Sequence, residues 1–169
     1  MEQENVVSID IRQVLIKTLA FCGFVIIAVV APYFGNQLIT GSIVNALLFI
    51  SAAVLGLEYA FLLCLIPSLI SIYTGLLPLA LAPMVPAIMT GNALLILVFV
   101  KLKNRGFWFS AILSAFVKFI FIYFTGIILF KNISLMISWP QLATAIAGAG
   151  IAFLILKIIN PPAGEAGKI

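Results

Sequence analysis

The stretch that decides the fold is residues 110–124, SAILSAFVKFIFIYF, an apolar and aromatic run with one lysine, Lys118, in its middle. A run of this composition predicts a helix that crosses a membrane. Burying a charged side chain in hydrocarbon costs from about 2.5 to above 10 kcal/mol, depending on the scale. Lys118 therefore needs either a specific partner or a route to the membrane surface.

The composition of the whole chain indicates the same class of protein. Of its 169 residues, 64% are hydrophobic and only 8% are charged, and the mean hydropathy is +1.31. A span needs about 20 apolar residues, so we predict one all-α integral membrane domain, a six-helix transmembrane bundle. The net charge of +4 is expected to follow membrane topology. We expect contact with membrane lipid and no nucleic-acid partner.

Six apolar runs define the predicted spans, at about 14–34, 41–57, 59–74, 84–100, 107–130 and 139–158. Glu58 marks the turn between the second and third runs. Residues 73–86 hold three prolines and a glycine, which predicts a loop that stays near the membrane. Pro140 suits the first turn of the last helix. The acidic N-terminus, MEQENVVSIDIRQ, lacks the basic region of a signal peptide, so we expect it to remain in the mature chain.

Lysine and arginine are concentrated on one side of this map. One side carries only Lys131, and the other carries Arg12, Lys17, Lys101, Lys103, Arg105, Lys157 and Lys168. Cytoplasmic loops are the ones enriched in these residues. We therefore predict that both termini are cytoplasmic and that the loops 35–41, 73–83 and 131–138 lie outside.

The helical neighbours of Lys118 indicate which way it points. It lies about 12 residues, or about 18 Å, from the basic end of its helix in a core about 30 Å thick. Small and polar residues on its face include Ala111, Ser114, Ala115 and Thr125, whereas large apolar residues occupy the opposite face. Lys118 is thus expected to point into the bundle or a wet cavity. It would meet amide oxygens, such as those of Asn45 and Asn92, or an anionic or carbonyl-bearing ligand; alternatively, it snorkels to the outer interface.

The chain contains few of the side chains that usually carry out catalysis. The chain has no histidine, and Glu58 is the only acidic residue between Asp10 and Glu165. Cys22 and Cys64 lie in separate apolar runs and are interpreted as packing residues. We predict no catalytic residue, no metal site, no cofactor and no enzymatic activity. No phosphate-binding loop is present, so the chain is not expected to hydrolyse ATP alone.

Three segments resemble a known family. GSIVNALLFISAAVLG at 41–56, LLPLALAPMVP at 76–86 and GNALLILVFVKLKNR at 91–105, together with six short helices, resemble the S components of energy-coupling factor (ECF) vitamin transporters. The likeness covers roughly residues 35–130. It implies a bacterial plasma-membrane protein that captures a small vitamin-like molecule at the outer face. It also implies a transmembrane coupling subunit and two cytoplasmic ATPases as partners.

The resemblance implies a pocket lined by helices four to six and closed by the outer loops. Asn92 and Lys118 are carried over as substrate-binding residues, with Tyr123, Trp139 and Gln141 as further candidates. The alanine-x-x-x-alanine pattern that docks the first helix of many S components is missing here. Small residues spaced by four, such as Ala145 and Ala149, occur in the sixth run instead. They suit packing within the bundle or docking to a partner.

The size and helix count also suit a structural membrane scaffold, similar to the rod-shape-determining subunit of cell-wall elongation. In that case Lys118 would be a packing or partner contact.

Overall fold

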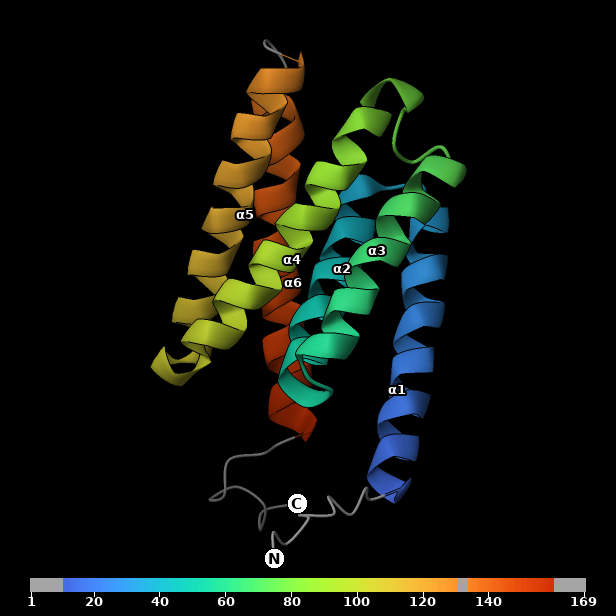
Figure 1. The fold of residues 1–169 in the computed structure, drawn as a ribbon, viewed down its shortest axis with the longest axis vertical. Coiled ribbons are helices and arrows are strands. Elements are labelled where there is room, and N and C mark those ends of the chain that lie inside the picture. The colour runs from blue at the N-terminus through green and yellow to red at the C-terminus, as the bar shows by residue number, and fades with distance from the viewer. Residues whose placement is uncertain (1–10, 131–133, 160–169) are drawn as a thin grey trace, which may run out of the picture.

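The computed structural model describes residues 11–130 and 134–159, which form a bundle of helices with no strand among them (Figure 1). The α-helices are α1 (Ile11–Val30), α2 (Gln37–Val54), α3 (Leu57–Tyr73), α4 (Val85–Leu102), α5 (Phe107–Phe130) and α6 (Ser134–Ile159). Short 3-10 turns, η1 (Ala31–Phe34), η2 (Leu79–Met84) and η3 (Lys103–Arg105), extend α1 and flank α4. The prediction of an all-helical chain is confirmed.

Five of the helical segments are long and apolar enough to cross a membrane. They are Ile11–Phe34, Gln37–Val54, Leu79–Arg105, Phe107–Phe130 and Leu135–Ile159. The remaining α-helix of the described residues, α3, is apolar but has only 17 residues. The chain therefore has the features of a multi-pass membrane protein. A sixth span and the cytoplasmic position of both termini stay predictions.

Local chemistry explains where the helices begin and end. Asn36 caps α2, because its Oδ1 accepts the backbone N–H groups of Leu38 at 2.9 Å and Ile39 at 3.2 Å. The connection after η1 is consequently shorter than the predicted loop 35–41. Gly56, with φ at 111°, makes the turn between α2 and α3, and Glu58 lies in the first turn of α3.

The predicted place of Pro140 in a first helical turn is wrong. The last helix begins at Ser134, before the predicted start of the sixth span, so Pro140 lies inside α6. A proline in a helix interior removes one backbone hydrogen bond, which a membrane helix tolerates where neighbouring protein covers it. The predictions about residues 1–10, Lys131, Asn132 and 160–169 lie outside the described residues.

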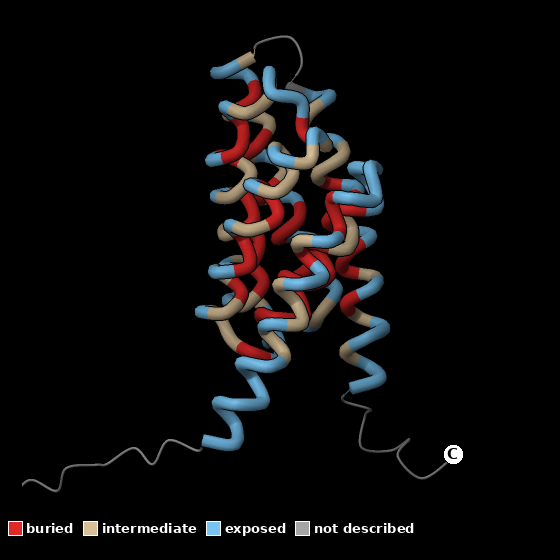
Figure 2. Tube along the Cα trace, turned by 90° about the vertical axis from the view of Figure 1, so that its right-hand side faces the viewer, coloured by how far each residue is buried: buried red, intermediate tan, exposed pale blue. Residues whose placement is uncertain are grey.

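The centre of the bundle is α2, which packs most extensively against α6 and also contacts α1, α3 and α4. Buried residues line the inward faces, whereas α1 lies at the edge and is mostly exposed (Figures 1 and 2). The exposed faces carry many large apolar side chains. A bilayer would cover such surfaces, because lipid tails are as apolar as these side chains.

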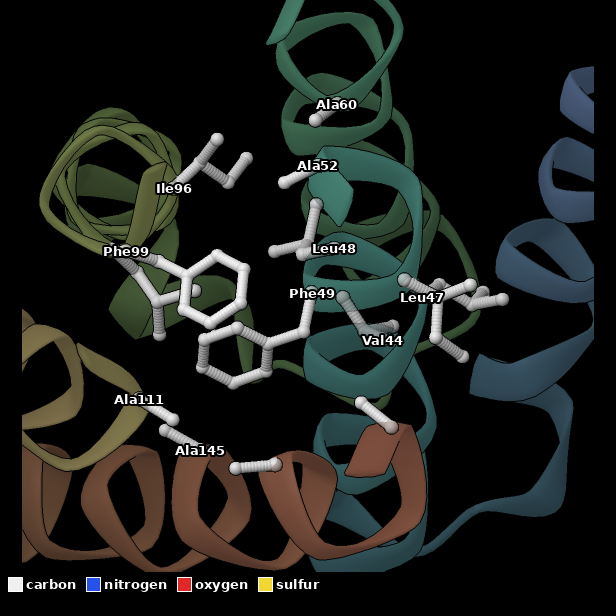
Figure 3. Close-up of a cluster of buried hydrophobic side chains, with 14 of the residues drawn as sticks. Val44, Leu47, Leu48, Phe49, Ala52, Ala60, Ile96, Phe99, Ala111 and Ala145 are labelled. Carbon is white, nitrogen blue, oxygen red and sulfur yellow. The ribbon is translucent and has the colours of Figure 1, made fainter. Parts of the chain in front are cut away.

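One half of the interior is a dry aromatic and aliphatic core. Phe49 of α2 meets Phe99 of α4 edge to face, with ring centroids 5.0 Å apart (Figure 3), and Phe107 of α5 stands 5.5 Å from Phe99. Leu95 and Ile96 of α4 are fully buried beside them. This apolar half lies toward the end where α2 joins α3 and α4 joins α5.

Glycines allow α2 and α6 to approach closely. A Cβ atom built on Gly148 of α6 would lie 2.7 Å from Asn45 Cβ, 2.8 Å from the backbone N of Ala46 and 2.8 Å from the carbonyl of Ser42. Gly41 of α2 lies similarly close to Thr144 of α6. Ala145 and Ala149 are buried within the bundle as well, so these small residues serve internal packing.

Apart from Lys118, the basic residues gather at one end of the described bundle. Lys101, Lys103 and Arg105 lie at the end of α4 and in η3, and Lys157 lies in the last turn of α6. The start of α1, which holds Arg12 and Lys17, lies at the same end (Figure 1). The positive-inside rule therefore predicts that this end faces the cytoplasm.

Gly148→Ala should destabilise the protein, since the new methyl meets backbone atoms of α2 that cannot move without separating the helices. Overpacking of this kind costs about 1–3 kcal/mol. Gly150→Ala is the matched control, because nothing lies within 4 Å of a Cβ at Gly150. Thermal unfolding in detergent should show a lowered midpoint for Gly148→Ala alone. Equal midpoints for the two variants would contradict the close approach of α2 and α6.

The orientation is testable by labelling single cysteines in a variant that lacks Cys22 and Cys64. An impermeant thiol reagent applied outside intact cells should label Gln37→Cys and Asn132→Cys, and should leave Asn104→Cys unlabelled. The opposite labelling pattern would overturn the predicted topology.

Candidate functional site

A cavity opens between five helices in the half of the bundle opposite the aromatic core. Its volume is about 70 Å³, which is room for about five water molecules at roughly 15 Å³ each. Its lining residues are Gln37, Thr40, Gly41, Val44 and Asn45 of α2; Pro67, Ser68 and Ser71 of α3; Leu76 and Leu77; Ile88 and Asn92 of α4; Lys118 of α5; and Pro140, Gln141 and Thr144 of α6.

Lys118 lies at the inner end of this cavity. Its side chain is only 1% exposed, and its Nζ donates a hydrogen bond to Asn45 Oδ1 at 2.9 Å. The lysine therefore does not snorkel to the membrane surface. One of the two amide side chains proposed from the sequence as its partner, that of Asn45, makes the contact.

The hydrogen bonds of this network all donate in one direction, away from Lys118. Because an ammonium is donor-only, Asn45 must present its oxygen to Lys118. Its Nδ2 then donates to the carbonyl of Gly41 at 2.8 Å and to Thr144 Oγ1 at 3.2 Å. Thr144 in turn donates to the carbonyl of Gln141 at 3.2 Å. The network starts at the cation, ends on helix carbonyls and ties α5, α2 and α6 together.

The described residues provide no negative charge near this ammonium. Glu58 is the only acidic side chain among them, and it is exposed in the first turn of α3, at the other end of the bundle. These residues also contain no group of three histidine, cysteine or acidic side chains that could hold a metal ion. An ammonium ion compensated by one amide oxygen keeps two donor positions and its full charge for another partner.

Asn92 supplies the complementary group. It is only 2% exposed, it lines the cavity, and its Oδ1 has no hydrogen-bond partner in the described part of the chain. A buried carbonyl without a donor costs about 1–3 kcal/mol. The cavity thus holds an unsatisfied acceptor on α4 and spare donors on α5.

Two prolines inside helices also line the cavity. Pro67 lies within α3 and Pro140 within α6. Each removes one backbone donor from its helix, which disrupts the regular hydrogen-bond pattern beside the polar space. Prolines at such positions are accommodated where helices line a cavity.

The other residues named from the sequence fall in different places. Gln141 lines the cavity with Asn92, Asn45 and Lys118. Tyr123 and Trp139 are not among the lining residues; both pack against Phe119, with ring centroids 6.2 Å and 5.8 Å away, and Trp139 is 56% exposed. The structure therefore brings four of the six proposed residues together and leaves two aromatic ones outside.

Sequence reasoning missed Thr144, Ser68 and Pro67. A signal was present in each case, because each is a polar or helix-breaking residue within an apolar run. Thr144 was obscured by the alanine-rich pattern around it. Its role depends on the helix register that places it opposite Asn45.

Comparison with known proteins adds no relative. No family model, no curated protein and no solved structure matches the chain. The arrangement of the cavity residues is therefore the basis for the functional argument.

The hydrogen bond between Lys118 and Asn45 predicts that replacing one partner changes the stability of the protein differently from replacing the other. Asn45→Leu should destabilise the protein by about 1.5–3 kcal/mol, because it leaves a buried ammonium without its hydrogen bond. Lys118→Met should be neutral or stabilising, because the buried charge disappears. The double variant should regain most of the stability that Asn45→Leu loses. Denaturant unfolding of the four proteins in micelles measures this cycle. Additive effects would refute an energetic link between Asn45 and Lys118.

Proposed function

We propose that this protein is the substrate-binding membrane subunit of an ECF-type importer in the bacterial plasma membrane, and that it captures a small vitamin-like molecule from outside. The observation that carries the proposal is the polar cavity that ends on Lys118, a buried cation without a carboxylate among the described residues. Intramembrane ionisable residues of this kind usually mark substrate or ion pathways.

The shape of the interior supports binding rather than conduction. The cavity residues lie toward the end where η2 leads into α4, and the opposite half is filled by Phe49, Leu95 and Phe99. Under the predicted orientation, the cavity end faces outward. A pocket closed by a dry core on the cytoplasmic side holds a solute until the helices move. That behaviour suits a subunit that captures a substrate and releases it with the help of partners.

The sequence supports dependence on other subunits. It contains no phosphate-binding loop, and a solute moved against its gradient needs an energy source. The proposed partners are therefore a transmembrane coupling subunit and two cytoplasmic ATPases. We propose no chemical transformation of the substrate, since the cavity lining includes no histidine, cysteine or carboxylate.

Purification from the native membrane tests this proposal. Mass spectrometry of the protein isolated in mild detergent should find a small molecule and ATPase subunits that accompany it. Lys118→Met should lose the small molecule by about tenfold to a hundredfold, the usual worth of a hydrogen bond to a charged group. Lys101→Met is the matched control, because Lys101 is exposed at the basic end of α4 and should leave the bound molecule in place.

Two results would overturn the proposal. The first is ATP-driven uptake by vesicles that contain this chain alone, because it would show an energy source within the chain. The second is recovery of cell-wall synthesis proteins with no small molecule, which would favour the scaffold function instead.

A further inference from the structure

We infer that the cavity binds a small carboxylate that carries a neutral hydrogen-bond donor, a hydroxyl or an amide N–H, on the carbon beside the carboxylate. This inference deepens the proposed function and rests on it. Among the described residues, two groups on neighbouring helices lack a partner in the cavity: the ammonium of Lys118 on α5 lacks a negative charge, and Oδ1 of Asn92 on α4 lacks a hydrogen-bond donor. We call these the two needs of the cavity.

The first need is a negative charge next to Lys118. Its Nζ donates to Asn45 Oδ1 at 2.9 Å, and Asn45 is neutral, so Asn45 supplies no counter-charge for a protonated Lys118 and leaves two of its N–H groups for another partner. An ammonium and a carboxylate form stronger hydrogen bonds than neutral pairs do. The only acidic residue in the described ranges, Glu58, is exposed at the other end of α3. A ligand carboxylate supplies the missing charge.

The second need is a donor for Asn92. Its Oδ1 is buried and has no hydrogen-bond partner within residues 11–130 and 134–159. A carboxylate cannot meet this need, because it only accepts hydrogen bonds. The ligand must therefore carry an O–H or N–H group as well.

The two needs are close enough for one small molecule. Asn92 and Lys118 line the same cavity, and a Cβ built on Gly91, the residue before Asn92, would lie 3.4 Å from Lys118 Cγ, so the lysine stem packs against α4 one residue before Asn92. The cavity volume of about 70 Å³ holds a group of about five non-hydrogen atoms, taking roughly 15 Å³ for each. A carboxylate with its neighbouring carbon and one oxygen or nitrogen is a group of this size.

The donor must be neutral. A charged ammonium beside the carboxylate would lie near Lys118 as well, and two cations in a water-poor site repel each other strongly. The cavity should therefore favour hydroxy acids and acylated amino acids over free amino acids.

Four small probes of similar size test the inference with purified full-length protein in micelles. They are lactate, propionate, methyl lactate and alanine, and isothermal competition against the molecule that accompanies the protein gives their relative affinities. Lactate should bind about tenfold more tightly than propionate, which lacks the donor. Methyl lactate, which lacks the charge, and alanine, which adds a cation, should both bind more weakly than lactate.

Variants assign each preference to a side chain. Asn92→Leu should make lactate and propionate equal while retaining the preference for lactate over its methyl ester. Asn92→Asp should weaken every carboxylate probe, because it places a carboxylate of the protein near Lys118. Ser51→Ala is the matched control, because the Ser51 hydroxyl is also buried and unsatisfied within the described residues but does not line the cavity. It should leave the order of the probes unchanged.

The outcomes separate this inference from the proposed function. If the accompanying molecule binds but propionate competes as well as lactate, or if Asn92→Leu keeps the lactate preference, the assignment to Asn92 is overturned and Oδ1 is satisfied by water alone. If alanine competes best, the neutral-donor requirement is overturned. If no small molecule accompanies the protein, the proposed function fails, and the four probes are then titrated directly; if none of them binds, this inference is overturned as well.

Discussion

The central constraint on the structure is the burial of the Lys118 ammonium, whose hydrogen bond to Asn45 lies in the middle of the bundle. A buried ammonium loses several kcal/mol of hydration, and one neutral oxygen recovers only about 1.5–3 kcal/mol of it. The amide must therefore be held firmly. It is held by its own bonds to the Gly41 carbonyl and to Thr144, which require α2 and α6 to approach as closely as Gly148 allows. The charge on α5 thus explains the tight packing of two other helices.

That interaction also divides the interior into two halves. One helical turn beyond Asn45 comes Phe49, and beyond Asn92 come Leu95 and Ile96, all fully or almost fully buried. The polar network therefore ends where the aromatic core begins. In a membrane, a close-packed core of this kind stabilises the bundle through van der Waals contacts between its helices. The packing of the apolar half offsets the energetic cost of the unsatisfied polar groups in the other half.

Sequence patterns predicted the helical class and a turn close to Glu58, because apolar runs and the residues that interrupt them reflect local conformational preferences. The turn itself is made by Gly56, and Glu58 already belongs to α3. The depth and facing of Lys118 also follow from helical spacing alone. The choice of Asn45 over Asn92 as its partner does not, since it depends on the register between α2 and α5. Pro140 was misplaced because its helix begins earlier than the apolar pattern suggested. Tyr123 and Trp139 resemble pocket residues by type, but both pack against Phe119. Tyr123 follows Phe119 by four residues on α5, so helical spacing already places the two together, whereas the Trp139 contact depends on how α6 packs against α5.

The neutrality of Asn45 would make the proposed binding site reversible. Had a carboxylate stood in its place, Lys118 would form a permanent ion pair, and an incoming anion would have to displace it. With an amide, the cavity keeps one net positive charge when empty, so it rejects cations and attracts anions. Filling it would relieve the cost of the uncompensated ammonium, and the ligand would stabilise the fold by an amount that rises with the logarithm of its concentration over its dissociation constant. The buried charge thus destabilises the empty protein, and a bound anion would offset that destabilisation.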